Sequence, residues 1–343
     1  MTVHPKQKKV RTKARLIGAG CIGVGLSGLV LPLIPGILFI LLGLSILSAH
    51  STRMHRLFAR MRMRYPDAAS RMERIESGII NTLGLSTHTH TYVHIPHPDG
   101  GDIHAVVNVA KHVGSPIAVL LHSARTTMEG RVQGAVADVL RAHGYTVVRF
   151  DAYNGLGESG GAFTNLTASR YRQDLDVVMA WVVEQPWWTG NATFFGHSVG
   201  GLVASLYALE HPEQVERLIL LGPAVSGTRY RQAEIARSKD AFEEWESTGI
   251  RTVRHPLLNE DFGLSFSFVE DMDSYDLEIH ASGFTMPVDI LVGTDDLTCT
   301  PVDARALADA IGPHARIHSL PDVPHIPASD RQLKTLEDTL THL

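Results

Sequence analysis

From residue 87 onward, short apolar runs alternate with longer segments in which apolar residues recur every three or four positions. Runs that are apolar throughout are typical of strands buried on both faces, and a spacing of three or four is typical of amphipathic helices. Strands that alternate with helices in this way predict a mostly parallel sheet covered by helices on both faces. We therefore expect an α/β fold over residues 87–343.

The pattern also gives the approximate limits of each element. Strands are expected at 91–95, 102–110, 116–121, 145–150, 192–196, 217–222, 288–292 and 315–320, and helices at 132–143, 169–184, 201–209 and 330–341. The first two strands flank Asp99-Gly100-Gly101. These residue types favour a tight turn, so the two strands are expected to form a hairpin.

A different pattern fills the N-terminal part, where Leu16 to Ala49 has no charged side chain. A straight helix over this segment would be about 51 Å long, whereas the hydrocarbon core of a bilayer is about 30 Å thick. Pro32, Pro35 and Gly36 interrupt its middle, which favours two apolar helices that form a membrane hairpin. A single kinked span and a cleaved signal peptide are the alternatives.

Charge separates the chain into a basic head and an acidic body. Residues 1–64 contain eleven Lys or Arg and no Asp or Glu, which leaves 20 basic and 36 acidic residues in the remainder. Basic side chains flank the apolar segment on both sides, and positive charge tends to stay in the cytoplasm, so both ends of the hairpin are expected there. The acidic body excludes a nucleic-acid role for it, and the two cysteines imply no disulfide framework.

The N-terminal part is expected to consist of two pieces. Residues 1–50 form the basic N-terminus and the membrane segment, and residues 51–86 form basic amphipathic or linker helices that lie on the membrane or pack on the body. The turn Leu31-Pro32-Leu33-Ile34-Pro35-Gly36 resembles that of small bacterial inner-membrane proteins. This resemblance implies an anchor in the bacterial inner membrane, with the body in the cytoplasm.

The pentapeptide Gly196-His197-Ser198-Val199-Gly200 carries the clearest chemical signal, because it fits the G-x-S-x-G pattern of a nucleophile elbow. It stands between the strand expected at 192–196 and the helix expected at 201–209. A serine in such a turn has a strained backbone that lifts its hydroxyl from the sheet edge, and Gly196 and Gly200 leave room for the turn. The alternative is a serine that only caps a helix.

Together with the elbow, three further stretches resemble the α/β-hydrolase superfamily. They are Leu120 to Ala124 after the third strand, the Asp151 to Gly161 loop after the fourth, and Gly293 to Asp296 at the end of the family's seventh strand. The resemblance covers residues 87–343. It implies a serine hydrolase of the esterase, lipase or serine-aminopeptidase type, with a mostly parallel sheet, helices on both faces and a small cap.

A nucleophilic serine needs a base that takes its proton and an acid that orients the base. The resemblance places the acid at Asp296, three residues after Gly293, and Asp295 is the rival. The base is expected after the last strand, where His325 lies, and this keeps the chain order Ser, Asp, His. Prolines bracket His325 on both sides, whereas the superfamily usually has glycine before this histidine.

The oxyanion hole of such an enzyme needs two backbone N–H groups. Val199 follows the nucleophile and is expected to supply one, and Ala124 after the third strand is expected to supply the other. Ser123 stands where the family usually has glycine. His122 and His197 are expected to be structural, and the chemistry calls for no metal or organic cofactor.

About 65 residues separate Gly222 from Val288, which is too long for a plain loop. We expect a cap at about 224–286 that contains a helix over residues 231–248. Its aromatic residues either line an acyl pocket or pack the cap: Phe262, Phe266, Phe268 and Tyr275. Its acidic residues either disfavour acidic substrates or form a solvated face: Glu243, Glu244, Glu246, Glu260, Asp261, Glu270, Asp271, Asp273 and Asp276.

The sequence as a whole predicts a membrane-anchored serine hydrolase that cleaves a carboxylic ester through an acyl-enzyme on Ser198. The expected partners are a small-molecule or lipid ester and, through residues 16–49, a membrane. A serine peptidase or aminopeptidase shares every triad residue and is the first alternative. A non-catalytic binding protein is the second, because a fold does not fix a function.

Overall fold

The computed structural model describes residues 19–20, 22–23, 90–255 and 259–343. Its contacts divide the chain into two compact units, residues 1–91 and residues 92–343. In the first unit, residues 19–20 and 22–23 are helical. The remainder of the hairpin expected within 16–49, and the helices expected over 51–86, lie outside the described residues. Within the described part of the chain, no helix is both long enough and apolar enough to cross a bilayer.

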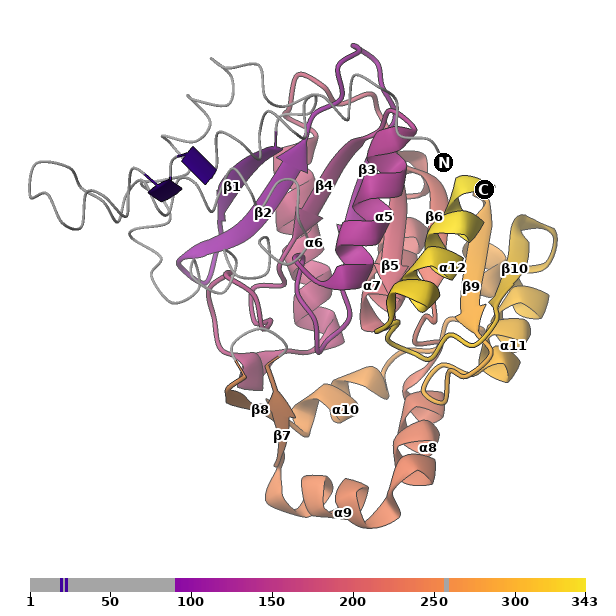
Figure 1. The fold of residues 1–343 in the computed structure, drawn as a ribbon. Coiled ribbons are helices and arrows are strands. Elements are labelled where there is room, and N and C mark those ends of the chain that lie inside the picture. Colours follow the sequence, from indigo (N-terminus) through magenta and orange to yellow (C-terminus); the bar gives the residue numbers. More distant parts are fainter. Residues whose placement is uncertain (1–18, 21, 24–89, 256–258) are drawn as a thin grey trace, which may run out of the picture. The chain divides into compact units, whose positions relative to one another are not determined.

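The second unit is built on an eight-stranded sheet with the order β1-β2-β4-β3-β5-β6-β9-β10 (Figure 1). Neighbouring strands from β4 to β10 run parallel, whereas β2 pairs with β4 antiparallel. The mostly parallel sheet predicted from the sequence is therefore confirmed. The strands are β1 His90–Pro96, β2 Asp102–Asn108, β3 Ile117–Leu121, β4 Thr146–Phe150, β5 Ala192–His197, β6 Val215–Leu221, β9 Val288–Gly293 and β10 Ala315–Leu320.

Helices cover both faces of this sheet. Strand β3 shows why: Ile117, Val119 and Leu121 point into one apolar cluster, and Ala118 and Leu120 point into another. Because side chains alternate along a strand, an apolar run without interruption needs cover on both sides. One face is covered by α5 Arg131–Ala142 and α12 Asp330–Thr341, and the other by α6 Ala168–Val182, α7 Val199–Glu210 and α11 Pro301–Ile311.

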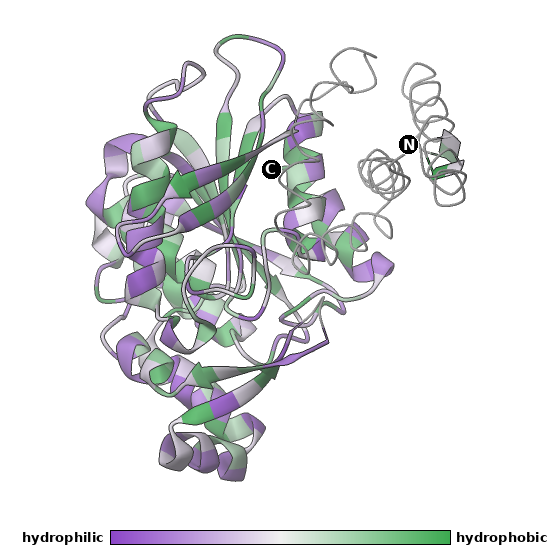
Figure 2. Cartoon of the chain, turned by 90° about the vertical axis from the view of Figure 1, so that its left-hand side faces the viewer, coloured by the Kyte–Doolittle hydropathy of each residue, from purple (hydrophilic) through white to green (hydrophobic). Residues whose placement is uncertain are grey.

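The hydropathy of the residues follows this layered arrangement. In Figure 2 the strands at the centre of the sheet are mostly hydrophobic, whereas the covering helices mix hydrophilic and hydrophobic residues. Such mixing is expected of helices with one buried stripe and one solvated face. Short 3-10 helices complete the unit at Phe163–Asn165, Pro212–Gln214, Ala281–Gly283 and Gly312–His314.

The cap lies between β6 and β9 and contains α8 Gly227–Arg237, α9 Lys239–Thr248, β7 Ile250–Arg254, β8 Asp261–Ser265 and α10 Ser267–Met272 (Figure 1). The single helix expected over 231–248 is wrong, because α8 and α9 are separated at Ser238. The backbone of Ser238 is extended (φ −165°, ψ 105°), and its hydroxyl accepts a hydrogen bond from the Ala241 amide. A serine at this position caps a new helix instead of continuing the old one.

Candidate active site

Ser198 occupies a strained turn between β5 and α7. Its φ of 59° and ψ of −121° lie where a side chain is rarely tolerated. Two glycines make the turn fit. A Cβ added at Gly196 would lie 2.4 Å from the Gly200 carbonyl oxygen, and one at Gly200 would lie 2.5 Å from the His122 carbonyl oxygen. The sharp strand-to-helix turn expected from the pentapeptide is thus present, with the serine at its tip.

Three distant segments meet at this turn. His325 Nε2 lies 2.9 Å from Ser198 Oγ, and His325 Nδ1 lies 2.8 Å from Asp296 Oδ2. The three residues follow β5, β9 and β10, whose carboxyl ends share one edge of the parallel sheet. The structure therefore brings the expected serine, acid and base together in the hydrogen-bonded order that a Ser-His-Asp triad requires.

The carboxylate of Asp296 is held on both sides. Oδ2 faces the imidazole, and Oδ1 accepts hydrogen bonds from the backbone amides of Thr298 and Cys299, each at 2.8 Å. The rival Asp295 is exposed, and its carboxylate accepts from the Thr294 hydroxyl at 3.1 Å. Asp296 and not Asp295 is therefore oriented toward His325.

Gly222 is a site residue that the sequence reasoning missed. It directly follows β6 and has a φ of +45°, and an added Cβ would lie 2.7 Å from Asp296 Oδ2 and 3.3 Å from His325 Nδ1. The acid–base pair therefore occupies the space that any larger residue at 222 would need. Its position at the end of the strand expected at 217–222 was the only signal in the sequence, and Gly196 likewise stands at the end of an expected strand.

His197 anchors the loop that carries the base. Its Nε2–H donates to the carbonyl oxygen of His325 at 2.8 Å, and its ring is completely buried. Burial, with the nearby His325 as a smaller cause, lowers the pKa of His197 to about 3. The imidazole is therefore neutral and serves as a hydrogen-bond donor, in line with the structural role expected for it.

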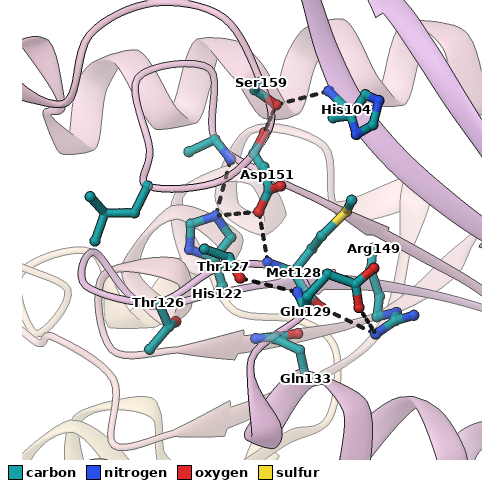
Figure 3. Close-up of polar contacts among 12 residues, drawn as sticks. His104, His122, Thr126, Thr127, Met128, Glu129, Gln133, Arg149, Asp151 and Ser159 are labelled. Carbon is teal, nitrogen blue, oxygen red and sulfur yellow. Dashed lines mark hydrogen bonds and ion pairs between the residues drawn. The ribbon is translucent and has the colours of Figure 1, made fainter. Parts of the chain in front are cut away.

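His122 holds the loop after β3 in a similar way. Its Nδ1–H donates to the Ser123 carbonyl oxygen at 2.8 Å, and its Nε2 accepts from the Ala152 amide at 3.0 Å. In Figure 3 the imidazole lies beside the Asp151 carboxylate. Burial lowers the pKa of His122 to about 4, so the ring remains neutral and one nitrogen stays free to accept. The imidazole joins the loop after β3 to the loop after β4.

Asp151 strengthens the same junction. One carboxylate oxygen accepts from the amide of Met128 at 2.7 Å (Figure 3), and the other accepts from the amide of Glu158 at 2.9 Å. Burial raises the pKa of Asp151 to about 7, although these two hydrogen bonds act in the opposite direction. A Cβ at Gly157 would lie 1.9 Å from the Asp151 carboxyl carbon, so the loop closes directly over this side chain.

A pocket of about 560 Å³, measured out to the solvent, opens beside Ser198. Ala124 and Val199, the expected oxyanion donors, line it together with Ser198 and His325. Among the described residues, the amides of Ala124 and Val199 donate to no acceptor. Two residues of the pocket lining thus have unengaged backbone N–H groups, and an oxyanion hole needs two such donors.

The cap forms the opposite wall of this pocket. Phe268 lines it, whereas Phe266 packs edge-on against Phe242 and Trp245 within the cap. Each of the two expectations for the cap aromatics therefore holds for a different residue. None of the nine acidic residues singled out in the cap sequence lines the pocket, and most of them are exposed.

Comparisons with known proteins agree with this geometry. Residues 114–256 match the family model described as "Serine aminopeptidase, S33". A mouse protein, palmitoyl-protein thioesterase ABHD10, is 27% identical over 185 residues, which are 53% of this chain and 59% of the relative. The chain thus spans less than two thirds of the length of this relative.

Two solved structures show the same fold. Est1E from Butyrivibrio proteoclasticus, with ferulic acid bound, superposes with a TM-score of 0.58 at 22% identity, covering 73% of this chain and 96% of the other. Mouse α/β-hydrolase domain-containing protein 10 superposes with a TM-score of 0.57 at 20% identity, covering 74% and 97%. The fold, the Ser-His-Asp arrangement and these similarities together support an enzyme of the serine-hydrolase type with the α/β-hydrolase fold.

Proposed function

We propose that the chain hydrolyses carboxylic esters or thioesters through an acyl-enzyme intermediate on Ser198. The observation that carries this proposal is the continuous chain of hydrogen bonds from Ser198 Oγ through His325 to the fixed carboxylate of Asp296. An isolated serine hydroxyl is a weak nucleophile at neutral pH, and this arrangement supplies the base that activates it.

In the proposed reaction, His325 Nε2 takes the proton of Ser198 Oγ as the oxygen attacks the acyl carbon. Asp296 accepts from His325 Nδ1–H and stabilises the imidazolium that forms. The amides of Val199 and Ala124 donate to the oxyanion of the tetrahedral intermediate. The bond to the leaving oxygen or sulfur then breaks and that atom receives the proton from His325. Water, deprotonated by the same imidazole, finally releases the acid.

Ester or thioester chemistry is favoured over amide chemistry by the relatives that share the fold. The mouse relative is named a palmitoyl-protein thioesterase, and Est1E is described with ferulic acid bound. Amide cleavage is the second candidate, because the matching family model is described as a serine aminopeptidase. Attachment of the domain to a membrane through residues 16–49, with the domain in the cytoplasm, is part of the proposal and rests on the apolar, basic-flanked sequence of that segment.

The first test compares matched variants on p-nitrophenyl esters of graded chain length, a palmitoyl thioester and an aminoacyl p-nitroanilide. Asp296→Asn should lower kcat by a factor on the order of 10³ to 10⁴, as expected when the base loses its orienting acid, whereas the neighbouring Asp295→Asn should stay near the wild-type value. Ser198→Ala should abolish labelling by a fluorophosphonate probe.

The outcomes separate the candidates. Faster turnover of the anilide than of any ester would favour the peptidase alternative. Labelling of Ser198→Ala equal to the wild type would refute catalysis by this serine. Recovery of the full-length chain in the soluble fraction after cell lysis would contradict the membrane attachment and leave the ester proposal untouched.

A further inference from the structure

Three ionisable side chains line the pocket besides His325 and Tyr230: Arg125, Glu234 and Arg251. Glu234 is buried, with only 3% of its surface exposed. Its two carboxylate oxygens are already engaged, one by Arg237 at 2.6 Å and the other by Arg251. The negative charge in the pocket is therefore neutralised by its own neighbours.

Arg125 is different, because its guanidinium has no hydrogen bond or ion pair with any described residue. It directly follows Ala124, so it belongs to the loop that presents an oxyanion donor, and it lines the same pocket as Ser198. Five N–H donors and a permanent positive charge therefore have no partner among residues 90–255 and 259–343, at a residue that lines the pocket of the nucleophile.

The hydroxyl of Tyr230 lies within the influence of these charges. Burial raises the pKa of Tyr230, and the positive charges of Arg125, Arg251 and Arg237 act in the opposite direction. The phenol remains protonated at neutral pH and can donate a hydrogen bond. Arg125, Arg251 and Tyr230 therefore line one pocket as hydrogen-bond donors, and the carboxylate of Glu234, which lines it too, is paired with Arg251.

We propose that Arg125 binds an anionic group of the substrate, a carboxylate or a phosphate, so that the preferred esters or thioesters carry a negative charge near the acyl carbon. The proposal rests on the function proposed above and adds a substrate class to it. It opposes the expectation that the acidic cap disfavours acidic substrates, because the acidic residues singled out there lie outside the pocket lining.

The experiment compares pairs of esters that differ in charge. On the acyl side, mono-p-nitrophenyl glutarate is compared with p-nitrophenyl pentanoate. On the leaving-group side, 4-acetoxybenzoate and 4-acetoxyphenyl phosphate are compared with 4-acetoxybenzamide. For each pair, kcat/KM is measured at 20 mM and 500 mM salt and corrected for the buffer reaction.

Wild-type enzyme should prefer the anionic member of at least one pair by about tenfold, the size expected of one charge-assisted hydrogen bond. Arg125→Gln should remove this preference and Arg125→Lys should keep part of it. The matched control is Arg305→Gln, which removes an exposed charge on α11 outside the pocket and should keep the full ratio. High salt should reduce the preference, because Arg125 is exposed.

A preference in the glutarate pair would place the anion on the acyl side, and a preference in the acetoxy series would place it on the leaving group. Comparison of 4-acetoxybenzoate with 4-acetoxyphenyl phosphate then shows whether a carboxylate or a phosphate is preferred. A wild-type ratio near one in every pair, or a ratio that survives in Arg125→Gln, would overturn the inference. Failure of the proposed function is a separate outcome, since it would abolish turnover of the neutral esters as well.

Discussion

Gly222→Ala tests whether the space around the acid–base pair is needed for activity. An added Cβ would lie 2.7 Å from Asp296 Oδ2, whereas ordinary contact between such atoms begins near about 3.5 Å. The carboxylate would have to move by about 0.8 Å. It cannot retreat freely, because the amides of Thr298 and Cys299 hold its other oxygen.

A shift of this size would break the 2.8 Å hydrogen bond between Asp296 and His325 or turn the imidazole away from Ser198. Misplacement of a catalytic group by about 1 Å costs on the order of 10²-fold in rate, so we expect kcat to fall by about that factor. The left-handed backbone at 222 adds a destabilisation of about 1–2 kcal/mol, because alanine is strained there.

Gly144→Ala is the matched control for this backbone strain. Gly144 also has a positive φ, +86°, but an added Cβ there would meet nothing within 4 Å. Both variants should lower the thermal unfolding midpoint, and only Gly222→Ala should lower kcat for p-nitrophenyl butyrate. A Gly222→Ala protein that is folded and turns over within threefold of the wild type would refute the argument from steric contact.

Two further predictions concern the buried groups around the site. Replacing His197 by Phe removes the donor to the His325 carbonyl, so kcat should fall by about tenfold with little change in KM. His197→Gln can still donate and should restore part of kcat. An unchanged kcat in the Phe variant would argue against this anchoring role. Burial raises the pKa of Asp151 to about 7, so the contribution of Asp151 to the free energy of unfolding falls as pH rises from about 4 to 7. Burial lowers the pKa of His122 to about 4, so the contribution of His122 rises over pH 4 to 6.5. Asp151→Asn removes the falling contribution of Asp151, so the unfolding midpoint should increase more steeply between pH 4.5 and 6.5 than in the wild type. An identical slope would contradict the pKa assigned to this carboxyl.

The strands, the covering helices and the position of Ser198 could be predicted because each depends on local pattern. A run such as residues 117–121 is apolar throughout, which restricts it to a strand buried on both faces. The Gly-x-Ser-x-Gly spacing specifies a turn whose glycines are needed for contacts within a few residues and with the adjacent strand. The chain order Ser, Asp, His, together with the family resemblance, then limited the acid to Asp296 or Asp295 and pointed to His325 as the base.

Residues whose importance depends on distant neighbours could not be found in this way. Gly222 matters because Asp296 and His325, more than seventy residues further along, fill the space beside it. Asp296 was preferred to the adjacent and chemically identical Asp295 only through the family resemblance, and what separates the two in the structure is the pair of amides at 298 and 299, which orients only one carboxylate. These distinctions arise in the folded chain, where spacing along the sequence no longer measures distance.

The cap shows most clearly why composition misleads about a binding pocket. Summed over its sequence, the cap is rich in carboxylates, which suggests a surface that repels anions. The electrostatics experienced by a substrate depend instead on the few groups that face the pocket and on whether each has a partner. Glu234 is neutralised by Arg237 and Arg251, whereas Arg125, on the loop after β3, has no partner among the described residues. A single guanidinium in the pocket lining can therefore outweigh the exposed carboxylates, whose charges are largely screened by solvent.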